Sequence, residues 1–437
     1  MLEWGIFFLL NILNMYSKNV IKSGLRLITY PMPESEAVTA QVFFGTGSYF
    51  EDKSISGISH FLEHVFFKGS KKYPKPKQIN QEIDKVGGMS NAFTGEEITS
   101  YFVKVSHEHT DLALDILSDV LVNPLFPEKE IEKERTVILE EMKLYEDDPD
   151  SKVGMKFEEL VYGDQPAGRP IIGREEVIRR LTREDFLRYR KDHYHVENAV
   201  VVVTGRIEEG EIEERVGGLF SGIPLGKAKS RPMVVQPKSG PKVIIERRPS
   251  EQTKIILGMP AYSLFDKRRY VLGVLGNILG GTASSRLFMK IREDKGLAYS
   301  VYSYASHAMD TGVFGSFAGT EIKNAEQVVK LMRDEYKSVV KKGVTARELK
   351  MAKDNIIGRL GIGLETSDRW AGFLGGQEIL ENKILMPDDI ADRISAVTLE
   401  EIKAVAADIF KPRNFHLALL GSFPQKSEDR FKKILAA

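Results

Sequence analysis

The sequence predicts an α+β protein of two homologous α/β-sandwich domains, each with a mostly antiparallel sheet and covering helices. Three observations support this. The composition is globular, with 42% apolar and 28% charged residues in a chain of 437. Strand-like apolar runs occur in clusters between amphipathic helices instead of in strict β-α-β order. A helix-to-strand motif also occurs twice, which indicates that one fold is duplicated.

The repeated motif supports the duplication most directly. Residues 181–205 read LTREDFLRYRKDHYHVENAVVVVTG, and residues 397–421 read VTLEEIKAVAADIFKPRNFHLALLG. Both copies run from a Thr-led helix start through an amphipathic helix to an Asn, an apolar strand and a closing Gly. At one constant offset and without a gap, Thr182, Asn198 and Gly205 correspond to Thr398, Asn414 and Gly421.

The expected elements follow from local patterns in each half. Strands are predicted at residues 40–44, 100–105, 199–204 and 254–258, and a helix with an apolar stripe at 111–122. Residues 226–242 (GKAKSRPMVVQPKSGPK) concentrate Pro, Gly, Ser and Lys, which is typical of a linker. We therefore expect an N-terminal domain over 15–225, a linker over 226–242 and a C-terminal domain over 243–437.

Residues 1–14 are predicted to be an extension upstream of a natural start at Met15. Residues 1–13 (MLEWGIFFLLNIL) are strongly apolar but too short to span a bilayer. They lack the basic leader and the small-residue cleavage site of a secretory signal. The alternatives for residues 1–14 are an interfacial or packed helix and an anchor or export signal.

Charge and cysteine content exclude several classes of function. Lys plus Arg and Asp plus Glu both number 62, so no global field attracts nucleic acid or an anionic membrane. The chain contains no cysteine, which excludes disulfides, thiol nucleophiles and thiolate metal sites. Any zinc must be held by His and carboxylate, and a cytoplasmic location is expected.

A short helix carries the first chemical motif. Residues 56–69 read SGISHFLEHVFFKG, and the apolar residues recur with helical spacing on one face. His60, Glu63 and His64 fall together on the opposite face. Two His at i and i+4 can share one metal ion, and the Glu before the second can reach a water on that ion. A solvated polar face is the alternative interpretation.

A second helix, predicted over residues 127–145, supplies carboxylates for the same ion. Glu134 and Glu141 lie within its apolar face, which holds Ile131, Val137, Ile138, Met142 and Tyr145. Buried carboxylates require a cation or a hydrogen-bonding partner, and a zinc site needs a third protein ligand. Both Glu side chains share one face, so helix geometry leaves open which of them is the ligand. Pairing with arginines at a helix edge is the alternative.

These motifs resemble the inverted zincins of the pitrilysin type, a family that includes insulin-degrading enzyme and mitochondrial processing peptidase. The resemblance extends over nearly the whole chain from Met15. It implies one Zn²⁺ per chain, with His60, His64 and Glu141 as ligands, Glu63 as the catalytic base and Glu134 as an acidic partner of the site. It also implies half of a clamshell chamber that encloses a peptide, completed by a second copy or a related chain.

Further segments share this resemblance. Residues 87–94 (GGMSNAFT) look like the edge strand on which the family binds substrate, which makes Asn91 and Ala92 substrate-binding candidates. Residues 168–173 (GRPIIG) and 285–299 also match. Within the latter, Arg292 and Tyr299 match a pair that binds substrate and steadies the oxyanion. The second half has no HxxEH motif, so its metal site is interpreted as lost.

The function predicted from these motifs is zinc-dependent endopeptidase activity on short or unfolded peptides, including leader peptides. A non-catalytic scaffold subunit of a processing-peptidase-like complex is the alternative, and a purely structural zinc is disfavoured because three protein ligands leave a position open. The His pairs at 107/109 and 193/195 are interpreted as surface or packing residues. The sequence contains no P-loop, dinucleotide fingerprint or GxSxG nucleophile elbow.

Overall fold

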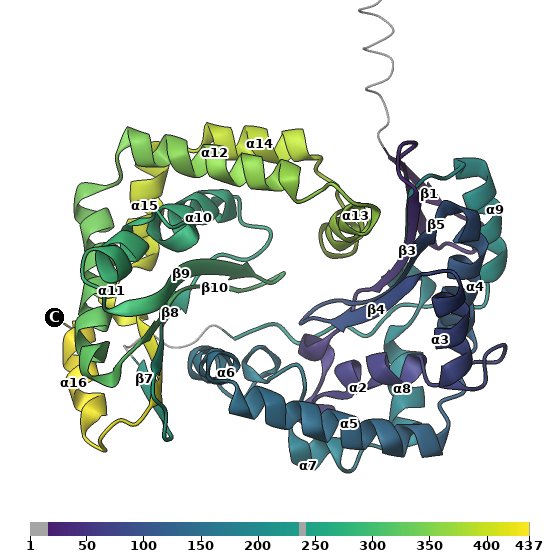
Figure 1. Ribbon diagram of the computed structural model, residues 1–437, viewed down its shortest axis with the longest axis horizontal. Helices are drawn as coiled ribbons and strands as arrows, with labels where there is room; N and C mark the ends of the chain where they lie inside the picture. The colour runs from purple at the N-terminus through teal and green to yellow at the C-terminus, as the bar shows by residue number, and fades with distance from the viewer. Residues whose placement is uncertain (1–15, 236–241, 437) are drawn as a thin grey trace, which may run out of the picture. The chain divides into compact units, whose positions relative to one another are not determined.

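The computed structural model describes residues 16–235 and 242–436, which form two compact units (Figure 1). The first unit holds the described residues up to Leu139, together with Ile171–Pro232 and Gly363–Ile384. The second holds Glu140–Pro170, Met233–Ile362 and the described residues from Leu385 onward. The predicted extension at 1–14 and residues 236–241 of the predicted linker lie outside the described residues.

The first unit is built on a six-stranded sheet. Its strand order is β1-β2-β6-β3-β5-β4, and only the β2–β6 pair is parallel among the described pairs. The strands are β1 (Ser17–Val20), β2 (Arg26–Pro31), β3 (Ala37–Phe44), β4 (Met89–Thr94), β5 (Thr99–Ser106) and β6 (Ala199–Gly205).

Helices cover both faces of this sheet. Among them, α4 packs on β5 and β3, and α13 packs on β3 and β6 (Figure 1). Central strand β6 is therefore buried along its whole length, which explains its continuous AVVVV run. The helices of this unit are α2 (Ile58–Phe66), α3 (Pro76–Lys85), α4 (Thr110–Val122), α7 (Glu175–Ile178), α8 (Arg183–His193), α9 (Glu209–Leu219) and α13 (Ser367–Glu381). Helix α5 (Glu128–Asp147) begins in this unit and ends in the second.

The second unit repeats the arrangement with five strands. Its order is β7-β11-β8-β10-β9, and again only one described pair, β7–β11, is parallel. The strands are β7 (Lys242–Arg247), β8 (Thr253–Pro260), β9 (Ala298–His307), β10 (Gly312–Thr320) and β11 (His416–Gly421). The helices are α6 (Pro149–Tyr162), α10 (Arg268–Gly276), α11 (Ala325–Lys342), α12 (Ala346–Ile362), α14 (Pro387–Ala396), α15 (Leu399–Ile409) and α16 (Ser427–Ala436).

The predicted duplication is confirmed in the hydrogen bonds of the repeated motif. Thr182 and Thr398 each cap a helix in a capping box, α8 and α15 respectively. The side-chain amide of Asn198 donates to the carbonyl of His193 at 3.1 Å. The side-chain amide of Asn414 donates to the carbonyl of Ile409 at 3.2 Å. In both copies the acceptor lies five residues before the Asn. The two halves therefore share a local structure as well as a strand order.

The compact units are not contiguous in sequence, unlike the predicted domains. Each unit includes one helix from the other half of the chain. Helix α6 belongs to the first half of the sequence but packs on β11, β8 and β7 of the second unit. Helix α13 belongs to the second half but packs on the first sheet, where Trp370 stacks on Tyr30 at 4.3 Å. The physical reason is that each sheet has a second apolar face, which in each case a helix from the other half buries.

The helices within residues 16–235 and 242–436 are too short or too polar to cross a bilayer. The cytoplasmic location stays a prediction.

Candidate active site

Helix α2 presents the predicted HxxEH motif as expected. Its apolar face is fully buried, with no exposed surface on Ile58, Phe61, Leu62, Val65 and Phe66. His60, Glu63 and His64 lie on the opposite face and remain partly accessible. The rings of His60 and His64 lie 4.8 Å apart, as helical spacing of i and i+4 requires.

The start of α2 is held by a buried carboxylate that the sequence analysis did not identify. Glu51 is 2% exposed and accepts hydrogen bonds from the amides of Gly57 at 2.6 Å and Ser59 at 2.8 Å. A carboxylate at a helix N-terminus satisfies free amides and favours the helix dipole. Gly57 has a φ of +95°, and a Cβ there would lie 2.7 Å from the carbonyl oxygen of Ile172. The GRPIIG segment therefore packs directly against the start of α2.

Three side chains converge on a point where one metal ion can be shared. Ligand atoms of His60, His64 and Glu141 all lie within 4.8 Å of one another. Among the described residues this is the one group of three or more His, Asp or Glu side chains with such geometry. Two imidazoles and one carboxylate form a donor set typical of catalytic zinc, with a fourth position left for water or substrate.

Helix α5 brings both carboxylates to the site, and each has a different neighbour. Ile131, Glu134 and Ile138 are its buried residues. Val137 and Tyr145, expected on the covered face, are 48% and 41% exposed, so the buried face is limited to the first part of the helix. Glu141 joins the metal group, whereas Glu134 contacts the ring of His64.

Glu134 lies between a histidine and a lysine. The Nδ1 of His64 donates to its Oε2 at 3.2 Å, and the Nζ of Lys68 lies 2.7 Å from its Oε1. Burial alone would raise the pKa of Glu134, but the hydrogen bonds from His64 and Lys68 hold this pKa below its ordinary value. A His that donates through Nδ1 leaves Nε2 as a lone-pair donor for a metal. Lys68 was missed by the sequence analysis, although it follows His64 by one helical turn.

The ring of His60 is suited to metal binding. Burial, and secondarily the charge of neighbouring His64, lowers the pKa of His60 to about 4. The ring is therefore neutral near pH 7, which is the form that binds zinc. The donor types and the neutral ring of His60 fit a zinc ion.

The carboxylate of Glu63 lies beside the predicted edge strand. The Oγ1 of Thr94, the last residue of β4, donates to the Oε2 of Glu63 at 2.6 Å. Strand β4 is the last in the sheet order and pairs with β5 alone among the described strands. Asn91 is exposed and Ala92 half-buried on it, and the Asn91 Oδ1 accepts from the Ala92 amide at 2.9 Å. Nothing in the sequence singled out Thr94 as a partner of Glu63.

Arg292 and Tyr299 lie together in the second unit. The Nη1 of Arg292 donates to the backbone carbonyl of Tyr299 at 2.7 Å, and its guanidinium lies 5.0 Å from the Tyr299 ring centroid. The Tyr299 side chain is 76% exposed at the start of edge strand β9. The pair therefore presents hydrogen-bond donors on one surface.

The described residues of the second unit contain no group of three His, Asp or Glu side chains of their own that could share a metal ion. At the constant sequence offset of the repeated motif, His60, Glu63 and His64 correspond to Gly276, Leu279 and Gly280, of which the last two lie beyond the end of α10. A Cβ at Gly280 would lie 2.3 Å from the backbone nitrogen of Ser303 on β9. The chain after α10 thus packs directly on the edge strand, which leaves no space for a side chain at Gly280.

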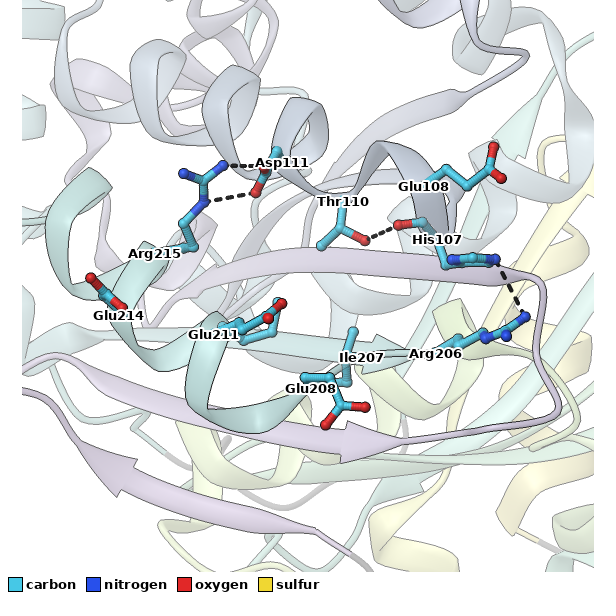
Figure 2. Close-up of a pocket in the computed structure, with 11 residues that line it drawn as sticks. His107, Glu108, Thr110, Asp111, Arg206, Ile207, Glu208, Glu211, Glu214 and Arg215 are labelled. Atoms are coloured by element: carbon cyan, nitrogen blue, oxygen red, sulfur yellow. Dashed lines mark hydrogen bonds and ion pairs between the residues drawn. The ribbon is translucent and has the colours of Figure 1, made fainter.

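A pocket of about 610 Å³ lies in the first unit and contains none of the predicted site residues (Figure 2). It is lined by residues near the starts of α4 and α9. His107 contacts Arg206 at 3.4 Å, Arg215 pairs with Asp111, and four glutamates also line the pocket, so its lining is mainly acidic. His107 is a surface residue in this ion-paired cluster. His193, by contrast, is buried and packs on Tyr189, with ring centroids 4.4 Å apart.

Known proteins are similar to this chain in sequence and in fold. Residues 26–175 match the family described as insulinase (peptidase family M16), and residues 180–356 match the peptidase M16 inactive domain. The chain is 35% identical over 406 residues to the uncharacterized zinc protease YmxG of Bacillus subtilis, covering 93% of this chain and 98% of that protein. It is 34% identical to an uncharacterized zinc protease of Streptomyces coelicolor, covering 96% and 92%.

Solved structures show the same fold. A protease from Helicobacter pylori has a TM-score of 0.86 at 24% identity, covering 93% of this chain and 99% of that chain. A peptidase M16 inactive domain from Pseudomonas fluorescens has a TM-score of 0.86 at 19% identity, covering 94% and 99%. The family matches and the two zinc-protease relatives establish that this chain belongs to the pitrilysin-type M16 family of zinc metallopeptidases.

Proposed function

We propose that the protein is a zinc-dependent metalloendopeptidase that hydrolyses short or unfolded peptides. The observation that carries this proposal is the convergence of His60, His64 and Glu141, with Glu63 on the same helix face as the two histidines. A zinc ion bound there supplies Lewis-acid chemistry, because it lowers the pKa of water and polarises a carbonyl group. The side chains of the protein transfer the proton, orient the metal ligands and bind the peptide.

Glu63 is proposed as the general base and then the general acid. Its carboxylate accepts a proton from the attacking water and delivers that proton to the leaving amine. The hydrogen bond from Thr94 to Oε2 restrains the carboxylate. Glu134 and Lys68 hold the His64 ring in the orientation that a metal requires.

Strand β4 is proposed as the substrate platform. An extended peptide can add to its free edge by backbone hydrogen bonds near Asn91 and Ala92, and the same strand carries Thr94 at its end. This mode of binding requires an extended chain, which favours short or unfolded peptides, including leader peptides. Arg292 and Tyr299 are proposed to stabilise the oxyanion or hold the peptide, since guanidinium and phenol groups both donate hydrogen bonds.

A second chain is proposed to complete the chamber. Family resemblance implies that this chain is half of a clamshell, so we propose a homodimer or a heterodimer with a related chain. Mixed dimers of Glu63→Gln and Arg292→Ala chains test whether Arg292 acts at the zinc site of its own chain or at that of the partner. Activity in the mixture would mean that Arg292 serves the partner's site.

The decisive experiment compares the wild type with Glu63→Gln for zinc content and for cleavage of an unstructured peptide library. We expect about one zinc per chain in both, with cleavage reduced by about 10²- to 10⁴-fold in the variant, because only the proton-transfer group is lost. Glu140→Gln is the matched control, because Glu140 is exposed and pairs with Lys143 at 2.7 Å. Zinc without cleavage in the wild type would favour a scaffold subunit, and loss of zinc from Glu63→Gln would contradict its role as a base.

A further inference from the structure

The segment that leads out of the first unit carries an arginine with a buried charge. Arg231 lies next to Pro232, after which the chain enters the second unit. Its Nη2 lies 2.7 Å from the Oε1 of Glu97, and the two side chains are only 8% and 5% exposed. Ion pairs on the surface contribute little, but a pair this buried must keep close geometry, since either charge alone would be costly.

Glu97 belongs to the turn that connects β4 to β5. This turn is closed by the Gly95 amide, which donates to the Ile98 carbonyl at 2.8 Å. On one side the amides of Ser48 and Tyr49 donate to the carbonyls of Gly95 and Glu96 at 3.2 and 2.8 Å. The guanidinium of Arg231 also lies 5.7 Å from the Tyr49 ring centroid. Arg231 therefore contacts both the turn and the segment that supports it.

The same turn begins directly after the residue that orients the base. Thr94 precedes Gly95 and donates to Glu63 at 2.6 Å. Because Thr94 is bonded directly to Gly95, a displacement of the turn also moves the Thr94 hydroxyl. Displacements of about 1 Å in a catalytic group can reduce a rate about 100-fold.

We infer that Arg231 is a positioning residue for the proposed hydrolysis, acting through Glu97 and the turn to hold Thr94 against Glu63. This inference rests on the proposed function and adds to it a residue remote in sequence from the metal motifs. Arg231 contacts Glu97 and the Tyr49 ring, so it acts on the reaction through the turn. The buried charge pair holds the turn in one place, which apolar packing alone would do less specifically.

The test is a double-variant cycle between Arg231 and Thr94 in the full-length protein. Arg231→Met, Thr94→Val and their combination are compared for kcat, KM and zinc content on one unstructured peptide. We expect each single variant to lower kcat about tenfold with KM within about twofold and zinc unchanged. The combination should be no slower than either single variant, because both act through one hydrogen bond.

Two further variants sharpen the result. Arg231→Lys keeps a positive charge beside the Glu97 carboxylate, so its kcat should be higher than that of Arg231→Met. Lys229→Met is the matched control, since Lys229 lies on the same segment, is 67% exposed and pairs with Asp192 instead of the turn; it should keep the wild-type kcat. If Arg231→Met does not fold, the double variant Arg231→Met with Glu97→Gln takes its place in the cycle. This variant also removes the buried negative charge that Arg231 would no longer balance.

Amide hydrogen exchange gives a readout that does not depend on activity. The Tyr49 amide, bonded to Glu96, should exchange about tenfold faster in Arg231→Met than in the wild type. An unchanged kcat, a combined loss of about 100-fold, or a loss of zinc would overturn the positioning role. A wild type that binds zinc and cleaves no peptide would instead overturn the proposed function, and the exchange rates would still decide whether Arg231 holds the turn.

Discussion

At the scale of single residues, Lys68 has the clearest expected effect on metal binding. Its Nζ and the His64 Nδ1 bind opposite oxygens of the Glu134 carboxylate. Lys68→Met should weaken zinc binding about tenfold, because Glu134 then holds the His64 ring less firmly. Competition with a chromogenic chelator measures this. Lys85→Met is the control, because Lys85 is 64% exposed and pairs with Glu82; equal zinc affinity in the wild type and Lys68→Met would contradict the prediction.

His193 is expected to make the stability depend on pH. Burial lowers the pKa of His193 to about 4. Above pH 6.5 the ring is neutral in the folded and unfolded chains, and contributes no pH dependence. As the pH falls from 6.5 toward 4, the unfolded chain binds a proton that the buried ring does not. The free energy of unfolding should therefore fall by up to about 3 kcal/mol over this range.

The matching variant is His193→Phe, which keeps a ring against Tyr189 but has no proton to bind. Urea unfolding at pH 7 and pH 4.5 should show a smaller loss of stability in this variant than in the wild type. The same loss in both proteins would show that other groups cause the pH dependence.

At the scale of elements, the N-terminus of α2 determines where the metal ligands point. Glu51→Gln leaves one good acceptor for the amides of Gly57 and Ser59 and turns a donor toward the other. We expect this to reduce the free energy of unfolding by about 1–3 kcal/mol, since a buried donor loses its partner. Thermal and urea unfolding measure the effect.

Asp52→Asn is the adjacent control for the α2 cap. Asp52 is an exposed residue that caps a short 3-10 turn through the Ser54 amide at 2.9 Å. Its substitution should change the stability by less than about 0.5 kcal/mol. Equal effects of the two substitutions would mean that the buried Glu51 cap has no special weight.

At the scale of the whole molecule, the exchange of helices couples the two halves of the sequence. Residues 15–232 alone lack α13, which covers the face of the first sheet that includes Tyr30 and Phe43. This fragment should be loosely packed and aggregation-prone, because that apolar face is then exposed to water. A peptide of residues 363–384 added in trans should restore cooperative unfolding.

The peptide with Trp370→Ala is the control for this experiment. Trp370 stacks on Tyr30 and is 8% exposed, so its loss should remove about 3–5 kcal/mol of packing. This peptide should therefore restore the fragment poorly. A fragment that unfolds cooperatively without any peptide would show that α13 is dispensable for the first unit.

The sequence by itself determined the features that depend on local periodicity. The apolar positions of α2 identified which face is buried, and so placed His60, Glu63 and His64 together. The repeated motif with its Thr caps and closing glycines likewise revealed the duplication, since a helix cap involves residues only a few positions apart.

Only the tertiary structure decided which distant side chains meet. Glu134 and Glu141 share one face of α5, so periodicity could not distinguish them. How α5 packs beside α2 decides that Glu141 joins the metal group and Glu134 binds His64. The contacts of Thr94 with Glu63 and of Arg231 with Glu97, and the packing of α13 on the first sheet, depend in the same way on the path of the chain. Periodicity tells which face of an element is covered, whereas the identity of the covering residues depends on packing between segments far apart in sequence.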